Sequence, residues 1–465
     1  MTSKELIQRY RTHPAIPEVA DFLHLHPEGR AHLQGLSGSG ALLVATGLVR
    51  SQEGVHTFIL GDKEEAAYVY NDFQNLLDPE KVMLFPTPFK HSRDERVQDN
   101  ANVLMRAETL DLLLKKPSWM VIVTYAEALR EPVASSRSLK KHVVELHTGD
   151  TYDLSFINEF LQEFHFERCD FVTRPGEFAI RGGILDVFSF SADMPYRLEF
   201  FGDELESIRQ FDVGTQLSVK TFRKVNILPN VEELDSVETR ESLVAMLPIH
   251  SCLWLRDARL TLEQLGDDHR PAFEAALPQY RLLEYGAHAH LSPQYQRVFR
   301  QQTPPFFRKN FDLLATFVHT QKDAGTQTLV TFSQGKQMER LHAIMQDIDP
   351  DAQFASVLLS LHEGFIDNDL RLAVLTDHQI FERYHRFRLK EGYHRSQQTL
   401  TIKDLMSLKK GDFVTHIDYG VGRFDGLQRV DNNGKIQEAL RIVYKDNDIL
   451  YVSIHSLHRI ARFSG

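Results

Sequence analysis

The sequence is poor in cysteine and has no long apolar run. Among its 465 residues, only Cys169 and Cys252 are cysteines, too few for a disulfide framework or a cysteine-rich zinc site. We therefore expect both thiols to be reduced and structural. No apolar run reaches the about 18 residues that a transmembrane helix needs, and the first residues contain no apolar signal core. These absences predict a cytoplasmic chain with no membrane partner.

Positive charge is also in short supply. The chain carries 53 Lys and Arg against 64 Asp and Glu, a formal net charge of −11. Coating DNA or RNA needs a clustered positive field, so this balance argues against a chain whose main task is nucleic-acid binding. Hydrophobic residues make up 42% and charged residues 25%, as in globular proteins. At about 100–200 residues per domain, the length predicts several domains.

The side chains of a working nucleotide site are missing from a loop that otherwise suits one. A strand is expected over 30–36 and a helix from 41 onward, and Gly35 and Gly40 between them have the glycine spacing of a P-loop. Ala41 and Leu42 then stand where a phosphate-binding Lys and a magnesium-binding hydroxyl are required. We interpret the segment as a glycine turn, a degenerate and non-functional P-loop. Its backbone amides could still hold an anion.

Other catalytic and metal-binding signatures are absent as well. The common hydrolase and kinase motifs do not occur, so no catalytic residue is predicted. His24, His26 and His32 lie close together in the sequence. Zinc needs three or four convergent ligands, and we interpret these histidines as surface residues, with no metal site.

Two patterns of strand and helix follow one another along the chain. Continuous apolar runs at 55–61, 81–85 and 119–125 alternate with helical segments, which predicts a parallel sheet covered on both faces. From about 139 to 218 the strands are short and closely spaced, which predicts an α+β module with an antiparallel sheet. Alternation of strands and helices returns from 306, and the last 60 or so residues are typical of a compact β module.

Arginines and phenylalanines alternate in the α+β module. Arg168, Arg174 and Arg181 recur along short strands, with Phe171 and Phe178 between them. Arginine beside an exposed aromatic residue is typical of a protein-binding hot spot. An ordinary surface ladder explains the pattern equally well.

The C-terminal β module offers a second candidate surface. Asn433-Gly434 between alternating strands predicts a tight hairpin. Ile436, Leu440 and Ile442 are candidate edge-strand residues that could pair with a partner's sheet, although a plain structural barrel fits equally well. The basic segment 383–395 could touch nucleic acid, but a solvated helix is the stronger interpretation.

Two long motifs resemble one protein family. Residues 175–188 (PGEFAIRGGILDVF) and 196–209 (YRLEFFGDELESIR) resemble the UvrB-homology module of bacterial transcription-repair coupling factors. Residues 416–424 (HIDYGVGRF) and 450–454 (LYVSI) resemble that family's RNA-polymerase-interaction domain, which is related to CarD-type regulators. The motifs occur in the family's order, and the resemblance covers essentially the whole chain.

The resemblance implies a multidomain fold of α/β and α+β parts. It consists of a UvrB-like, P-loop NTPase-like domain with a degenerate P-loop and an α+β insert, a second small α/β domain, and a Tudor-like (CarD-type) β-barrel. The expected bounds are 1–130 for the UvrB-like domain, 131–212 for the UvrA-binding insert, 213–305 for the rest of the UvrB-like module, 306–385 for the small α/β domain, 386–402 for a basic linker and 403–465 for the barrel.

The resemblance also implies partners. By motif position, Arg168 and Arg181 match basic residues of the family's UvrA-binding surface, and Phe178, which lies nearby, is also expected to bind UvrA, whereas Arg174 cannot be carried over. The barrel is expected to bind the β subunit of RNA polymerase by strand pairing. Its contacts are our own prediction and comprise Leu427, Ile436, Leu440, Arg441 and Ile442.

The family's ATP-driven DNA translocase should follow the barrel, so the chain resembles an N-terminal fragment. ATP, magnesium and double-stranded DNA would then belong to that motor, and the fragment would need no cofactor. We expect a monomeric, non-catalytic adaptor that links stalled RNA polymerase to UvrA in nucleotide excision repair of DNA damage. The alternative is a UvrB-like or helicase-like ATPase or DNA-binding repair protein.

Overall fold

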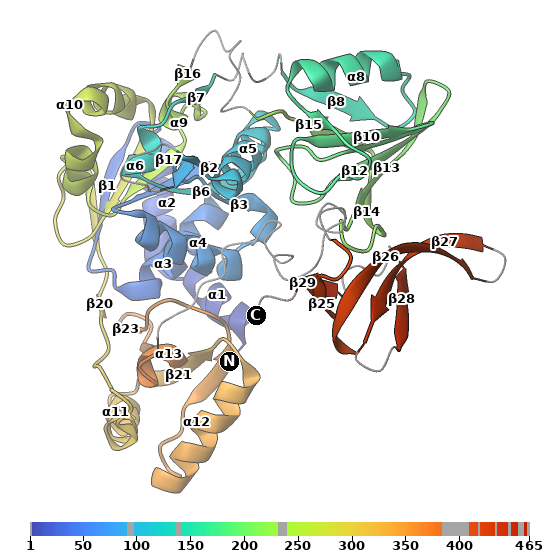
Figure 1. Cartoon of the computed structure of the whole chain (residues 1–465). Helices are drawn as coiled ribbons and strands as arrows, with labels where there is room; N and C mark the ends of the chain where they lie inside the picture. Colours follow the sequence, from blue (N-terminus) through green and yellow to red (C-terminus); the bar gives the residue numbers. More distant parts are fainter. Residues whose placement is uncertain are drawn as a thin grey trace. The chain divides into compact units, whose positions relative to one another are not determined.

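A computed structural model of the chain (Figure 1) describes residues 2–90, 97–135, 139, 142–230, 240–383, 409–416, 419–432, 435–444, 448–453 and 460–462. The chain divides into two compact units. One comprises residues 1–136 with 239–389, and the other comprises 137–238 with 390–465. Within the described ranges, no helix combines the length and apolarity needed to cross a bilayer.

A seven-stranded sheet forms the centre of the first unit. Its order is β19 (Tyr295–Val298), β1 (Arg30–Gln34), β18 (Arg281–Tyr285), β17 (Cys252–Leu255), β2 (Gly54–Leu60), β6 (Trp119–Tyr125) and β3 (Val82–Leu84). Every neighbouring pair is parallel. The parallel sheet predicted from the continuous apolar runs is confirmed, and three of its strands come from beyond residue 250.

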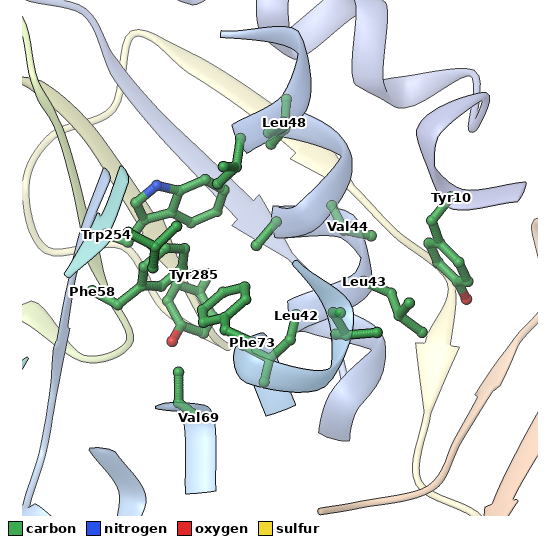
Figure 2. Close-up of a cluster of buried hydrophobic side chains, with 14 of the residues drawn as sticks. Tyr10, Leu42, Leu43, Val44, Leu48, Phe58, Val69, Phe73, Trp254 and Tyr285 are labelled. Carbon is green, nitrogen blue, oxygen red and sulfur yellow. The ribbon is translucent and has the colours of Figure 1, made fainter. Parts of the chain in front are cut away.

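Helices cover both faces of this sheet because the strands are apolar on both sides. The helices are α1 (Ser3–Arg11), α2 (Ala15–Leu25), α3 (Gly38–Ser51), α4 (Lys63–Leu76), α5 (Asn100–Leu114), α6 (Ala126–Leu129), α9 (Leu243–Met246) and α10 (Ala258–Ala276), with 3-10 turns η1 (Pro79–Lys81) and η2 (Leu277–Gln279). Helix α3 is almost wholly buried. Figure 2 shows Leu42 and Leu48 of α3 in the cluster that contains Phe58, Phe73 and Trp254.

The insert leaves and re-enters the first unit through a two-stranded stem, β7 (Val133–Ala134) paired with β16 (Arg240–Glu241). Its main sheet has the order β14 (Ser218–Phe222), β13 (Glu204–Phe211), β12 (Tyr196–Phe201), β11 (Ile184–Val187), β10 (Glu177–Arg181) and β9 (Glu167–Arg168). Only the β9–β10 pair is parallel. Helix α8 (Leu154–Glu163) and the pair of β8 (Val144–His147) with β15 (Lys224–Ile227) complete it. Strands β14 and β15 extend the insert beyond the predicted bound at 212.

A second, smaller α/β sheet belongs to the first unit. Its order is β20 (Gln301–Gln302), β23 (Phe365–Asp367), β24 (Leu372–Thr376), β21 (Gln327–Phe332) and β22 (Ala355–Leu358), with helices α11 (Phe311–Asp323), α12 (Gly335–Ile348) and α13 (Asp377–Ile380). A short pair, β4 (Phe89–Lys90) and β5 (Val97–Gln98), lies elsewhere in this unit. The loop between β22 and β23 reaches the glycine turn after β1.

The C-terminal module is a five-stranded antiparallel sheet. Its order is β28 (Ile449–Ser453), β27 (Lys435–Val443), β26 (Gly420–Asn432), β25 (Phe413–His416) and β29 (Ile460–Arg462). Asn432 pairs with Lys435, the register of the predicted two-residue hairpin, whose two residues lie outside the described ranges. The basic linker at 386–402 also lies outside them.

Candidate functional sites

The glycine turn after β1 has a geometry that only glycine fits. Gly35 has a φ of +73°, and a Cβ added there would lie 2.2 Å from the carbonyl oxygen of Phe299. Gly38 opens α3 with a φ of +50°, and its Cβ would lie 2.6 Å from the carbonyl oxygen of Gly364. The turn is therefore fixed by close backbone contacts with two distant segments.

The amides of this loop are bound by the chain's own oxygens. The Ser37 N–H donates to Gln301 Oε1 at 3.1 Å, and the Ser39 N–H donates to the Glu363 carbonyl at 3.2 Å. The Gly40 N–H donates to the Ser37 carbonyl at 3.1 Å. In a phosphate-binding loop such amides point at the phosphate. Here they hold a side-chain amide and backbone carbonyls instead.

A buried carboxyl group links the loop to the β22–β23 segment. Ser39 Oγ donates to Asp72 Oδ2 at 2.6 Å, and the His362 N–H donates to Asp72 Oδ1 at 2.9 Å. The Glu363 N–H donates in turn to Ser39 Oγ at 3.0 Å. Burial raises the pKa of Asp72 to about 7, against the opposing effect of these hydrogen bonds.

The two residues that break the P-loop pattern both line a neighbouring cavity of about 750 Å³. Leu42 is 6% exposed and also belongs to the core (Figure 2), against which Ala41 packs. Neither residue can supply the ammonium or hydroxyl group that holds a phosphate or magnesium ion.

The cavity lies where strands β1, β2, β17 and β18 end, the usual ligand position in parallel α/β sheets. Six acidic residues line it, Asp62, Glu64, Glu65, Asp72, Asp257 and Glu363, with Arg256 as the one basic residue besides His362. Arg256 forms an ion pair with Glu65. A triphosphate would meet charge of its own sign here, so the residues present do not fit ATP.

The insert presents a second candidate site at β9 and β10. Arg168 and Arg181 are both exposed. The Arg181 guanidinium lies 5.4 Å from the centre of the Phe171 ring, donates to the Asp170 carbonyl at 2.5 Å and pairs with Asp186. Phe171 is 39% exposed. Arginine and aromatic side chains thus share one surface, as a hot spot requires.

Asp186 holds Arg181 in place. Its side chain is 1% exposed, and it also accepts two hydrogen bonds from Arg197, at 2.7 and 2.8 Å. Arg174 belongs to a separate network with Glu167 and Glu177. Arg174 and Arg181 are therefore oriented by ion pairs within the insert.

Phe178 is not part of this surface. It is fully buried, in the core of the insert, opposite Arg168 in the β9–β10 register. The prediction that its side chain contacts a partner is corrected, because no part of the ring is accessible. Phe171 is the exposed phenylalanine beside Arg181, and the alternation of Arg and Phe along the sequence already included it as a candidate.

The predicted residues of the C-terminal sheet separate into two groups. Leu440 and Ile442 are fully buried, and their strand pairs on both sides, with β26 and β28. The expectation that they form a free edge is corrected. Leu427 is 46% exposed, and Arg441 faces Asp425 at 3.3 Å.

Ile436 is described only by its backbone, which pairs with Asp431 of β26. The β28 pairing begins at Ala439, so 435–438 extend beyond β28. Tyr451, opposite Arg441 in the register, is 45% exposed and was not among the predicted residues. Polymerase binding by this sheet stays a prediction.

Comparisons with known proteins match both candidate regions. Residues 144–232 match the family model of the UvrB interaction domain, and residues 408–464 match that of the CarD-like/TRCF RID domain. The match regions coincide with the insert and with the C-terminal sheet.

Curated relatives match most of the chain. The transcription-repair-coupling factor of Bacillus subtilis (strain 168) is 22% identical over 93% of this chain and 45% of its own length. That of Myxococcus xanthus is 23% identical over 94% and 46%, and that of Escherichia coli (strain K12) is 23% identical over 74% and 38%. The chain thus spans less than half the length of these relatives. In its two matched domains and along most of its length, the chain is similar to the transcription-repair-coupling factors, as its motifs predict.

Proposed function

We propose that the chain is a non-catalytic adaptor in transcription-coupled DNA repair. It would bind UvrA through the insert and the β subunit of RNA polymerase through the C-terminal sheet, and it would act as a monomer. The observation that carries this proposal is the presence of a UvrB interaction domain and a CarD-like/TRCF RID domain in one chain.

The UvrA contact is best assigned to Arg168, Phe171 and Arg181. All three side chains are exposed. Arg168 lies in the edge strand β9, and Arg181 of the adjacent strand β10 contacts the Phe171 ring. Arginine and aromatic anchors carry most of the binding energy in many interfaces. The ion pair with Asp186 orients Arg181 before binding, which lowers the entropy lost on association.

The insert is tested by measuring UvrA affinity for an Arg168→Ala/Arg181→Gln double variant. Loss of two hot-spot arginines should weaken binding at least about tenfold. Arg209→Gln is the matched control, because it also removes an arginine from an ion pair in the same sheet. Equal UvrA affinity of the double variant and wild type would refute the assignment of this surface.

Removal of residues 403–465 tests the polymerase contact. The shortened chain should lose binding to RNA polymerase and keep its affinity for UvrA, because the UvrB interaction domain ends well before this module. Retained polymerase binding would place the contact elsewhere in the chain.

The alternative function, a UvrB-like ATPase, is disfavoured by the glycine turn. Its amides are bound by Gln301 and Glu363, and the adjoining cavity is acidic. Titration calorimetry with Mg-ATP should give no saturable binding. Micromolar affinity would support the ATPase and refute our interpretation of the turn.

A further inference from the structure

A partly exposed tryptophan at the amino edge of the seven-stranded sheet, where its strands begin, carries two cations. Trp119 is the first residue of β6, and it packs against the core of the first unit. The Arg50 guanidinium lies 4.4 Å from the centre of the Trp119 ring, and the Lys81 ammonium lies 4.7 Å from it. Both distances are those of cation–π contacts. One ring thus holds two positive charges that come from separate elements, α3 and η1.

These two cations have no carboxylate partner in the described chain. Their charged atoms are at most about 9 Å apart, within the Debye length at moderate salt, so the two charges repel each other. Across the part of the chain that the structure describes, no ion pair involves Arg50, Lys81 or the exposed Lys116, which lies between α5 and Trp119. A helix C-terminus attracts cations, which explains Arg50 in the last turn of α3 but not the second cation on the same ring. The group therefore attracts an anion.

The backbone beside this group is open. Gly54 of β2 pairs with Trp119 in the sheet. It has a φ of +114°, and a Cβ added there would meet no atom within 4 Å. The acidic cavity lies at the opposite edge of the same sheet, where the strands end. An anionic partner would therefore meet charge of its own sign at the carboxyl edge and unpaired cations at the amino edge.

We propose that Arg50, Lys81 and Lys116 bind the phosphate backbone of double-stranded DNA without reading its sequence. Lysine supplies two of the three charges, and lysine is depleted in protein–protein interfaces but common in phosphate contacts. Sites for single strands stack the bases on free aromatic faces, whereas cations already cover the Trp119 ring. A duplex keeps its bases stacked inside and presents its phosphates, which cations alone can bind. The choice of DNA rests on the proposed function in DNA repair.

Fluorescence anisotropy of a short labelled DNA duplex of mixed sequence, titrated with the whole chain, tests the proposal. We expect saturable binding with a dissociation constant below about 100 μM at low salt. Three phosphate contacts predict that the logarithm of the affinity falls with the logarithm of the salt concentration with a slope of about −3. Trp119 gives a second readout, because Trp254, the other tryptophan, is buried. The intrinsic fluorescence should change with the same midpoint as the anisotropy.

Four variants locate the contact. Arg50→Gln/Lys81→Gln should weaken duplex binding about tenfold or more and reduce the salt slope by about 2. Lys81→Arg keeps the charge and should bind like wild type. Glu53→Gln removes the exposed carboxylate one residue before β2 and should strengthen binding. Lys322→Gln/Lys336→Gln is the matched control, because it removes two exposed lysines from the helices of the second sheet, and it should bind like wild type.

Several results would overturn the proposal. Equal duplex binding by Arg50→Gln/Lys81→Gln and wild type, or equal weakening by the control variant, would remove the contact from this edge. Tighter binding of the single strand would contradict the argument from the covered ring. Equal competition by polyglutamate, which carries carboxylates in place of phosphates, would make the group a site for acidic proteins. UvrA affinity, measured in parallel, should be the same in Arg50→Gln/Lys81→Gln and wild type, so failure of the DNA contact can be told apart from failure of the adaptor function.

Discussion

Replacing Asp72 by asparagine should remove a pH-dependent loss of stability from the first unit. The carboxyl group is fully buried, and burial raises its pKa to about 7. In the unfolded chain the pKa is about 3.9. The folded state therefore holds a proton that the unfolded state has released, and the free energy of unfolding falls as the pH rises from about 4 to about 7.

The size of the effect follows from the shift. Each pKa unit is worth about 1.4 kcal/mol, so a shift of about 3 units corresponds to roughly 4 kcal/mol over the whole range. Between pH 5 and pH 8 the wild type should lose roughly 3 kcal/mol relative to Asp72→Asn. The variant also rearranges the hydrogen bond with Ser39, which adds a term that does not change with pH. The pH trend of the difference is therefore the quantity to measure.

Urea unfolding followed by tryptophan fluorescence is the suitable assay. The chain has two tryptophans, Trp119 in β6 and Trp254 in β17, and both lie in the sheet that α4 and Asp72 cover. The signal thus reports this unit and not the insert. Asp62→Asn, an exposed cap of the same helix, is the control, because asparagine caps equally well. A difference between wild type and Asp72→Asn that stays constant from pH 5 to pH 8 would refute the buried-acid argument.

Three further predictions concern single side chains. Gly35→Ala should destabilise the first unit by at least about 3 kcal/mol, because the new Cβ meets a backbone carbonyl. Gly54 also has a positive φ but open space around it, so Gly54→Ala should cost only about 1–2 kcal/mol. The same fluorescence assay measures both variants. Phe178→Ala should lower the stability of the insert by about 3–5 kcal/mol, seen as faster amide hydrogen exchange in its strands, and wild-type exchange would contradict its core position. Arg181→Glu should destabilise the insert by about 1–3 kcal/mol, because it places a carboxylate against buried Asp186. Arg181→Gln should destabilise it less. Equal amide exchange rates in the two variants would argue against a contact between residue 181 and Asp186.

Local sequence patterns predicted the strands of the parallel sheet that are continuous apolar runs, and they missed the others. The runs at 55–61 and 119–125 are mostly apolar, and their strands are buried at every position after the first, as in strands covered on both faces. Strands β17, β18 and β19 were not predicted, because residues 219–305 show no comparable alternation. Their place beside β1 and β2 depends on pairing between segments that lie far apart in the sequence, such as Cys252 with His56 and Leu282 with Arg30, which no local pattern encodes.

In the candidate sites too, the sequence pattern suggested which residues could bind a partner, but packing decides which of them are exposed. Alternation assigns residues two apart to one face of a strand, but it does not say which face another layer covers. Phe178 and Phe171 are both phenylalanines between arginines, and only burial separates the core residue from the exposed one. Likewise, Leu440 and Ile442 are apolar residues that would suit an exposed edge strand. Their strand is internal, however, because β28 pairs with it.

At the glycine turn, the missing P-loop residues are only part of what distinguishes this loop from a nucleotide-binding site. From the sequence, Ala41 and Leu42 are the whole departure from a P-loop. In the structure the departure extends over three segments, because Gln301 and Glu363 bind the loop amides and acidic residues from α4 and α10 line the cavity beside it. Restoring a lysine and a hydroxyl at 41 and 42 would leave those oxygens and charges in place. What this cavity can bind therefore depends more on the residues that now bind the loop amides and line the wall than on the absent lysine and hydroxyl at 41 and 42.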